Sequence, residues 1–455
     1  TQFKNLPIGQ MEEKFADYGE VQIKQLNDRS KMYYTPNKEN NVFQLVVQYG
    51  AGEREFPKLG YAAQLMNNAG IMGAYEPQEL KEELSKLNAT CHVTADDDNL
   101  YIIMEGYEAT LPQACQLLSR QILMPKLDEK QLARLKGSAM GMRQQRKDNV
   151  SILNEALRQY MLYGEKSDYI KELTDKEIYE LQISELTGDI NRASNYEAKV
   201  FFTGTLPFDQ VYDILSKNLP LVANERPSNS PQAKDMMPVT ENTVYFLPNN
   251  DAEQAQIHLY IPMQKADKKD DVLRSAFNQY FGLDFTGIVL NEIREKRSMA
   301  YTAYAFVGTQ GIAGKASYLR GYIGTQNDKA NDALDVLMGL VNDMPKNPER
   351  IDNIKSYLRQ AMLTSHPSFR NKAMELVDLG YRGYTDDPAK ENLPKVDALT
   401  FDDIVKFYEE NIKDKPYCIS IMGNPKNIDL KRLEKFGKVV KLNERKLFNT
   451  KDALF

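Results

Sequence analysis

Alternating apolar and polar positions predict paired strands at two distant places in the chain. MYYTPNKENNVFQLVVQYG at 32–50 and VYFLPNNDAEQAQIHLYIP at 244–262 both read as a strand, a Pro-Asn turn and a second strand. The alternating apolar positions of the second strands are Phe43, Leu45, Val47 and Tyr49 in the first copy, and Ile257, Leu259 and Ile261 in the second. A period of two is expected of strands with one buried face.

A second pair of apolar segments repeats at almost the same distance. KVFFTG at 199–204 and CISIMG at 418–423 both predict a strand that ends at a glycine. The two offsets, 244 − 32 = 212 and 418 − 199 = 219 residues, agree closely. The chain has 455 residues, more than a single hydrophobic core usually serves. We therefore predict a duplicated domain of about 200 residues, a common domain size.

Helical spacing of apolar residues follows the strands in both halves, in the same order. The predicted helices are 111–124, 128–147 and 151–163 in the first half, and 328–344, 348–364 and 369–379 in the second. Asp128, Ser151 and Thr400 are predicted N-caps, and Thr174 with Glu177 has the spacing of a capping box.

These elements predict an α+β fold of two tandem homologous domains. Each domain should be a mainly antiparallel β-sheet covered by helices. The polar, Pro-rich stretch 224–242 has no apolar period and is the expected linker. The predicted domains are therefore 1–223 and 243–455.

Composition and charge narrow the range of partners. The net charge of −6 gives no basic field for nucleic acid or for an anionic membrane surface. No apolar run approaches the roughly 20 residues that span a bilayer. Cys91, Cys115 and Cys418 lie among apolar neighbours and are odd in number, so buried thiols are favoured over a disulfide framework.

The run LNEIREKRSMAY at 290–301 is the most informative segment for function. Together with the strand that begins at 254–256 and the helix AFNQYFG at 276–282, it resembles the second domain of insulinase-type (M16, pitrilysin-like) zinc peptidases and mitochondrial processing peptidase subunits. The resemblance covers nearly the whole chain and implies their LuxS/MPP-like metallohydrolase fold.

The same resemblance implies that Arg294 and Tyr301 face a substrate. A guanidinium can donate paired hydrogen bonds to peptide carbonyls, and a phenol can donate to the oxyanion of a tetrahedral intermediate. Without the flanking match, the same two residues would be a solvated helix end and a half-buried strand residue.

The zinc-binding pattern of that family is missing. A catalytic zinc site commonly needs two His on one helical turn and a carboxylate further on. Where the resemblance puts the first His, the general-base Glu and the second His of the inverted His-x-x-Glu-His motif, this chain has Ala63, Met66 and Asn67. Leu135 and Met142 stand where a ligand carboxylate is expected. We predict no metal and no cofactor in this chain.

The remaining candidate sites have structural interpretations. His92, His258 and His366 are far apart in sequence and are expected to be hydrogen-bonded structural residues, with His258 on the polar side of a strand. The acidic run 96–98 lacks the Gly and Glu of a calcium loop and predicts a solvated turn. GTQGIAG at 308–314 predicts a hairpin loop. FGLDFTG at 281–287 lacks the glycine-rich loop of the non-catalytic processing-peptidase subunit, so presequence recognition is not implied.

The resulting hypothesis is a pseudo-peptidase: a non-catalytic, substrate-binding half that contributes Arg294 and Tyr301 to a composite site. Its partner would carry the His-x-x-Glu-His motif and hold the zinc, either as a separate subunit or as the N-terminal part of the same precursor. The absence of an initiating Met favours the precursor. The expected substrate is a peptide or unfolded segment added as a strand to a sheet edge. The compartment stays open, with the cell envelope favoured over the cytoplasm.

Two alternatives stay open at this point. The chain could be a structural or binding protein of the same fold, as the core subunits of a respiratory complex are, with no proteolytic role. It could also be an independent zinc enzyme with a rebuilt site, in which case the isolated chain would hold stoichiometric zinc.

Overall fold

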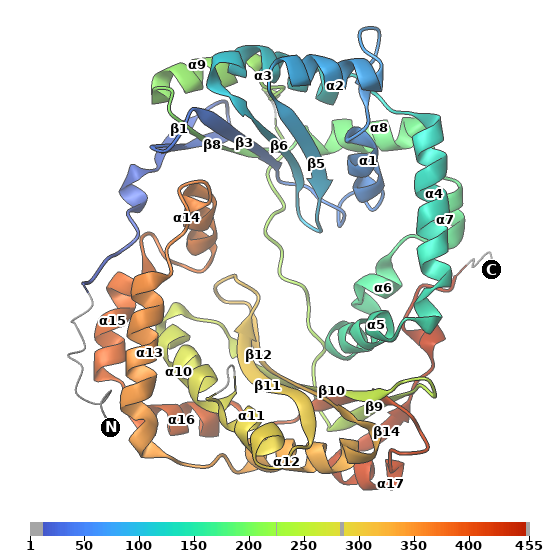
Figure 1. Cartoon of the computed structure of the whole chain (residues 1–455), viewed down its shortest axis with the longest axis vertical. Coiled ribbons are helices and arrows are strands. Elements are labelled where there is room, and N and C mark those ends of the chain that lie inside the picture. The colour runs from blue at the N-terminus through green and yellow to red at the C-terminus, as the bar shows by residue number, and fades with distance from the viewer. Residues whose placement is uncertain (1–11, 224, 283–285, 452–455) are drawn as a thin grey trace. The chain divides into compact units, whose positions relative to one another are not determined.

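A computed structural model describes residues 12–223, 225–282 and 286–451, which form two compact units (Figure 1). The N-terminal unit contains 18–237, 368–377 and 443–451, and the C-terminal unit contains 12–17, 238–367 and 378–442. The main division lies between Met237 and Pro238, inside the stretch predicted as the linker. The sequence did not predict that three short segments cross between the halves. Residues 12–17 belong to the C-terminal unit, and residues 368–377 and 443–451 belong to the N-terminal unit.

The N-terminal unit contains a six-stranded sheet, a small two-stranded sheet and helices. Its strands are β1 (Gln22–Gln25), β2 (Lys31–Pro36), β3 (Val42–Tyr49), β4 (Gly70–Ile71), β5 (Thr90–Ala95), β6 (Leu100–Tyr107), β7 (Pro125–Lys126) and β8 (Ala198–Gly204). Its helices are α1 (Leu59–Met66), α2 (Pro77–Lys86), α3 (Leu111–Leu123), α4 (Glu129–Gln144), α5 (Val150–Tyr163), α6 (Asp168–Lys171), α7 (Asp175–Tyr179), α8 (Ile183–Ala193) and α9 (Phe208–Asn218).

The strand order of the large sheet is β1-β2-β8-β3-β6-β5. Only the pairing of β2 with β8 is parallel. The strand β8 lies between β2 and β3, so the two strands of the stretch 32–50 do not pair with each other. In the described part of the chain, the terminal strand β5 pairs with β6 alone.

Both faces of this sheet are covered. On one face, the alternating residues of β3 pack in a core with α1, α3, α8 and α9. On the other face, Val46 and Phe201 pack with Ala373 of α14 (Lys372–Tyr381). Val46 lies between the apolar positions of the alternating pattern, and it is buried as well because the segment 368–377 covers that face.

The C-terminal unit is built on a second six-stranded sheet. Its strands are β9 (Thr243–Pro248), β10 (Gln254–Lys265), β11 (Ala300–Thr309), β12 (Ala316–Gln326), β13 (Cys418–Gly423) and β14 (Lys438–Lys441). Its helices are α10 (Asp271–Phe281), α11 (Ile288–Leu290), α12 (Ala330–Asn342), α13 (Ile351–Thr364), α15 (Pro388–Ala398), α16 (Phe401–Asn411), α17 (Leu430–Leu433) and the end of α14.

The second sheet repeats the arrangement of the first. Its order is β11-β12-β10-β13-β9-β14, and β13 lies between β9 and β10 as β8 lies between β2 and β3. The outermost strands differ, because β14 pairs with β9 in parallel whereas β1 pairs with β2 antiparallel. Each unit is therefore a mainly antiparallel sheet covered by helices, which confirms the predicted α+β fold.

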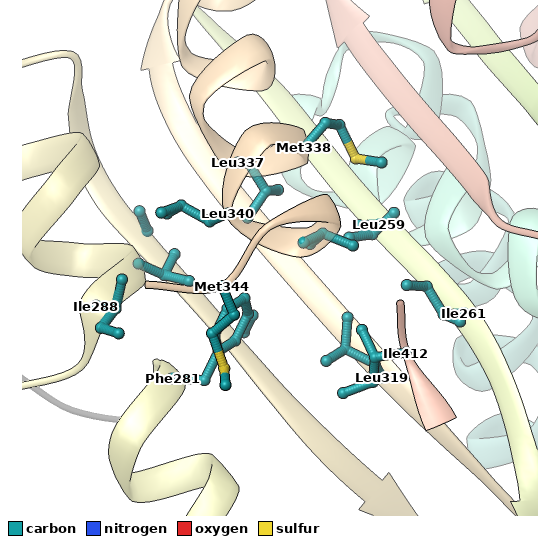
Figure 2. Close-up of a cluster of buried hydrophobic side chains, with 14 of the residues drawn as sticks. Leu259, Ile261, Phe281, Ile288, Leu319, Leu337, Met338, Leu340, Met344 and Ile412 are labelled. Carbon is teal, nitrogen blue, oxygen red and sulfur yellow. The ribbon is translucent and has the colours of Figure 1, made fainter. Parts of the chain in front are cut away.

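Apolar side chains from the second sheet and its helices form one continuous core (Figure 2). Leu259 and Ile261 of β10, Leu319 of β12 and Leu337 of α12 all belong to this core, and Leu319 lies beside Ile412. These side chains are almost completely buried, and burial of such residues is the main term that stabilises the fold.

Most of the local sequence signals hold in the structure. Asp128 and Thr400 cap α4 and α16, and Thr174 forms a capping box with Glu177. The prediction of Ser151 as an N-cap is wrong, because α5 begins one residue earlier and Asn149 accepts the hydrogen bond from the Ile152 N–H. Residues 310–315 join β11 and β12 as the predicted hairpin loop. Within the described ranges, no helix combines the length and apolar character needed to cross a membrane.

Candidate functional site

The segment that holds Arg294 and Tyr301 is a helix end joined to an edge strand by a tight turn. A π-helical turn covers Asn291–Glu295, directly after α11. Ser298 has a positive φ of 49°, and its N–H donates to the Arg294 carbonyl over 2.8 Å. The next N–H, of Met299, donates to the Ile293 carbonyl over 2.9 Å. The turn therefore places the end of the helix directly against the start of β11.

Arg294 is half exposed, with 44% of its side chain accessible. Its Nε lies 3.5 Å from the carboxylate of the adjacent Glu295. The nearby cations Lys296 and Arg297 are instead both bound to Glu292, and their hydrogen bonds hold the pKa of that carboxyl below its usual value. Arg294 thus has a looser ion pair than its neighbours, which leaves its guanidinium donors open to an added ligand.

Tyr301 is the extra residue of a β-bulge. Ala300 pairs with Thr325 and Thr302 pairs with Gly324, so Tyr301 has no partner on β12. Its side chain is 54% exposed, and its hydroxyl oxygen accepts a hydrogen bond from Gln326 Nε2 at 3.3 Å. π-helical turns and β-bulges both occur often beside functional sites, where they redirect side chains.

The positions that correspond to the zinc motif lie on and just after α1 in the N-terminal unit. Ala63 and Met66 are buried in the apolar core, with 0% and 1% exposure. Asn67 caps the C-terminus of α1. Leu135 packs against the same core, and Met142 is exposed. An alanine methyl and four apolar or amide side chains do not supply the donors that zinc requires. The described residues contain no group of three His, Cys, Asp or Glu that could hold a metal.

The lone histidines lie on separate elements. His92 is exposed on β5, and His366 is exposed after α13. His258 lies on β10 with its ring 5.1 Å from that of Tyr322. The expectation that His258 faces a polar side is wrong, because this face of β10 is buried and His258 is only 2% exposed.

The acidic run and the cysteines have structural roles. Asp96 accepts hydrogen bonds from the N–H groups of Asp98 and Asn99, and Arg54 bridges two of the carboxylates, so the run is a turn. The three cysteines are free; Cys115 and Cys418 are buried and Cys91 is partly buried. Burial raises the pKa of Cys115 to about 12. Of the stretch 281–287, residues 283–285 lie outside the described residues.

Sequence reasoning treated Asn67 only as a lost ligand and missed what its side chain does. Asn67 Nδ2 donates to the Val93 carbonyl at 2.9 Å, and its Oδ1 accepts from the Val93 N–H at 2.8 Å. Asn278 of α10 makes the same two bonds to Val307 of β11, at 3.0 and 2.6 Å. The repeat could have revealed this pair, because 278 − 67 = 211 is close to the repeat offset.

Comparisons with known proteins agree with this fold. Residues 194–358 match the family described as "Peptidase M16 inactive domain". No curated protein sequence matches the chain. Over these residues, the match confirms the resemblance to insulinase-type peptidases predicted from the sequence.

Solved structures show the same fold at low sequence identity. A peptidase M16 inactive domain from Pseudomonas fluorescens has a TM-score of 0.68 and 17% identity, covering 89% of this chain and 98% of that one. The ferredoxin protease FusC in complex with Arabidopsis ferredoxin has a TM-score of 0.70 and 12% identity, covering 91% of this chain and 46% of that one. The periplasmic protease PqqL from Escherichia coli has a TM-score of 0.66 and 12% identity, covering 91% and 47%. The chain thus spans about half the length of the two proteases.

Proposed function

We propose that this chain is the non-catalytic, substrate-binding half of a zinc metallopeptidase of the M16 type. The observation that carries the proposal is the placement of Arg294 and Tyr301. Both are exposed, and they lie on a π-helical turn and a β-bulge on the two sides of one tight turn. These irregular elements are held by backbone hydrogen bonds, so the two side chains are presented from a fixed support.

The two side chains suit two steps of peptide-bond hydrolysis. The Arg294 guanidinium can donate to carbonyl oxygens of an extended peptide. The Tyr301 hydroxyl already accepts a hydrogen bond from Gln326, so its own O–H is left to donate to a developing oxyanion. An accepted hydrogen bond also strengthens the donated one.

The remaining chemistry is assigned to a partner half with the His-x-x-Glu-His motif. Its zinc would act as the Lewis acid and its glutamate as the general base. The partner is either a separate subunit or the N-terminal part of one precursor. This chain covers only 46% and 47% of two similar proteases, which leaves room in such proteins for a second half. We propose peptides or unfolded segments as substrates and, in line with the periplasmic relative, the cell envelope as the location.

The test is reconstitution with the candidate zinc-bearing half and a quenched fluorescent peptide. Removing an oxyanion donor commonly lowers kcat by about 10²- to 10³-fold, so we expect Tyr301→Phe to lower kcat strongly with little change in KM. We expect Arg294→Ala to raise KM, because it removes contacts to the bound peptide.

Matched controls are available in the same unit. Tyr357→Phe alters another exposed tyrosine, and Lys296→Ala alters an exposed cation two residues from Arg294. Both should leave kcat and KM near their original values. If Tyr301→Phe and Arg294→Ala behave like these controls, the composite-site proposal is wrong and the structural or binding role becomes the better account.

A further inference from the structure

The β11–β12 hairpin carries an arginine that no acidic residue neutralises. Arg320 of β12 pairs with Phe306 of β11 on one side and with Tyr260 of β10 on the other. The six strands of this sheet contain no Asp or Glu. Within the part of the chain that the structure describes, Arg320 forms no hydrogen bond or ion pair, and its Nε is buried without a partner. A buried donor left without a partner costs free energy, so packing of the sheet does not explain this charge.

Aromatic rings surround Arg320 on the face of the sheet opposite to the apolar core. Leu319 and Ile323 of β12 belong to the core, as do the alanines of β11, and the residues that alternate with them lie on the other face. Five of these residues are partly exposed, and we call them the Arg320 face: Tyr304, Phe306, Tyr318, Arg320 and Tyr322. The Tyr304 ring lies 5.3 Å from that of Tyr322 and 6.1 Å from that of Phe306. The rings therefore form one aromatic surface beside the guanidinium.

The matching position of the N-terminal sheet shows that the fold does not require a cation there. Ile103 of β6 pairs with Val46 of β3, as Arg320 pairs with Tyr260, and 260 − 46 = 214 is close to the repeat offset. Val46 and Ile103 pack with the segment 368–377. The N-terminal unit thus has apolar contacts where the C-terminal unit has a partly exposed charge.

The Arg320 face continues to Tyr301. Gln326, which donates to the Tyr301 hydroxyl, is on the same face of β12 as Arg320, because 326 − 320 = 6 is an even spacing. Six residues of a strand span about 20 Å, which is also the length of about six residues of an extended peptide. A peptide held at Tyr301 can therefore reach Arg320.

A guanidinium beside aromatic rings suits a carboxylate that has apolar or aromatic neighbours. The guanidinium can donate two parallel hydrogen bonds to a carboxylate, and the rings add apolar and stacking contacts. Because the sheet holds no acidic residue, an anionic ligand meets no like charge from its strands.

We propose that the Arg320 face binds a carboxylate of the substrate, from an Asp or Glu side chain or from the C-terminus. This carboxylate would have apolar or aromatic neighbours and would lie about six residues from the bond to be cleaved. The proposal rests on the proposed function, because it names the class of peptide that the site at Arg294 and Tyr301 would receive.

The experiment measures peptide binding to the full chain by fluorescence anisotropy, without the zinc-bearing half. The first probe is a fluorescein-labelled, C-terminally amidated decapeptide of Gly and Ser around a central Tyr-Glu-Phe. The second probe has Gln in place of Glu. The third is the Gln peptide shortened so that it ends at Phe with a free carboxylate. We expect the first or the third probe to bind about tenfold more tightly than the second, the effect of one charge-assisted hydrogen bond. The probe that does so identifies the source of the carboxylate.

Substitutions separate the charge from the rings. Arg320→Gln should abolish the preference for a carboxylate, and Arg320→Lys should keep part of it, because lysine keeps the charge without the paired geometry. Phe306→Leu should weaken all three probes alike. Lys315→Gln, in the exposed loop between β11 and β12, changes the net charge equally and is the matched control, which should keep the full preference. Urea unfolding checks that each variant folds, and Arg320→Met should be at least as stable as the original protein because it removes an unpartnered donor.

Three results would overturn the proposal. One is equal binding of all three probes by the original protein. Another is a loss of preference in Lys315→Gln as large as in Arg320→Gln, which would assign the effect to net charge. The third is a clear loss of stability in Arg320→Met, which would give the charge a structural role. Failure of the composite site would be seen separately, as peptide hydrolysis unaffected by Tyr301→Phe while the preference for a carboxylate persists.

Discussion

Glu53 carries the most specific prediction about how stability depends on pH. This carboxylate lies in a cavity of about 760 Å³ in the N-terminal unit, close to Asp97 and Asp168. Burial, together with repulsion from Asp97, Asp96 and Asp168, raises the pKa of Glu53 from 4.5 to about 6. Its backbone is fixed by a 2.9 Å hydrogen bond to the Asp96 carbonyl, so the carboxylate is held near these acidic groups.

The sign of the effect follows from the raised pKa. The folded protein binds the proton of Glu53 more tightly than the unfolded chain does, so the favourable contribution is complete below pH 4.5 and is lost as the pH rises through about 6. The difference between 4.5 and about 6 corresponds to about 2 kcal/mol at about 1.4 kcal/mol per pKa unit. Because the group is partly exposed and screened by water, we expect about 1 kcal/mol.

The assay is urea unfolding of the original protein and of Glu53→Gln at pH 4.5 and pH 7.5. We expect the substitution to raise the free energy of unfolding by about 1 kcal/mol more at pH 7.5 than at pH 4.5. Glu185→Gln is the control, because a hydrogen bond from Lys58 lowers the pKa of Glu185. Its contribution is lost only as the pH falls below 4.5, so this substitution should have nearly the same effect at both pH values. An equal effect of Glu53→Gln at both pH values would refute the reasoning.

Two further predictions concern local stability. Thr174→Ala removes half of a capping box and should lower the free energy of unfolding, measured in urea, by about 1 kcal/mol. The control, Ser151→Ala, removes no helix cap and should change this free energy little. Phe448→Ala removes an edge-on contact to Tyr169 at 5.5 Å and a cation–π contact with Arg146 at 5.4 Å. The substitution should lower the free energy of unfolding by about 1–2 kcal/mol and speed proteolysis of 443–451. An unchanged cleavage rate would show that these contacts do not hold the segment.

Local patterns in the sequence predicted several elements of the fold. The alternation in β3 and β10 marked their buried faces, and the repeat offset predicted two similar units. These signals are local or depend on comparing two segments of one chain. Helix caps such as Thr174 could also be predicted from the sequence, because the hydrogen bonds they make lie within one turn of the helix.

Features that depend on distant segments could not be read from those patterns. The insertion of β8 between β2 and β3 joins residues more than 150 positions apart, as Tyr34 with Phe202 shows. The burial of Val46 depends on the segment 368–377. Arg294 and Tyr301 came from a resemblance, while the bulge at Tyr301 follows from the register with β12, which the sequence does not display.

The positions that the resemblance matches to the zinc motif also show why a zinc site would be hard to build here by single substitutions. A histidine at Ala63 or a glutamate at Met66 would place a polar group in an apolar core, at a cost of about 1–3 kcal/mol each unless it found a partner. A histidine at Asn67 would in addition break both hydrogen bonds to Val93, which hold β5 to the end of α1. Each of these substitutions would therefore lower the stability of the fold, and metal binding could offset the loss only when all the ligands were present. The two hydrogen bonds of Asn67 and the apolar face of α1 therefore both oppose a zinc site built one residue at a time.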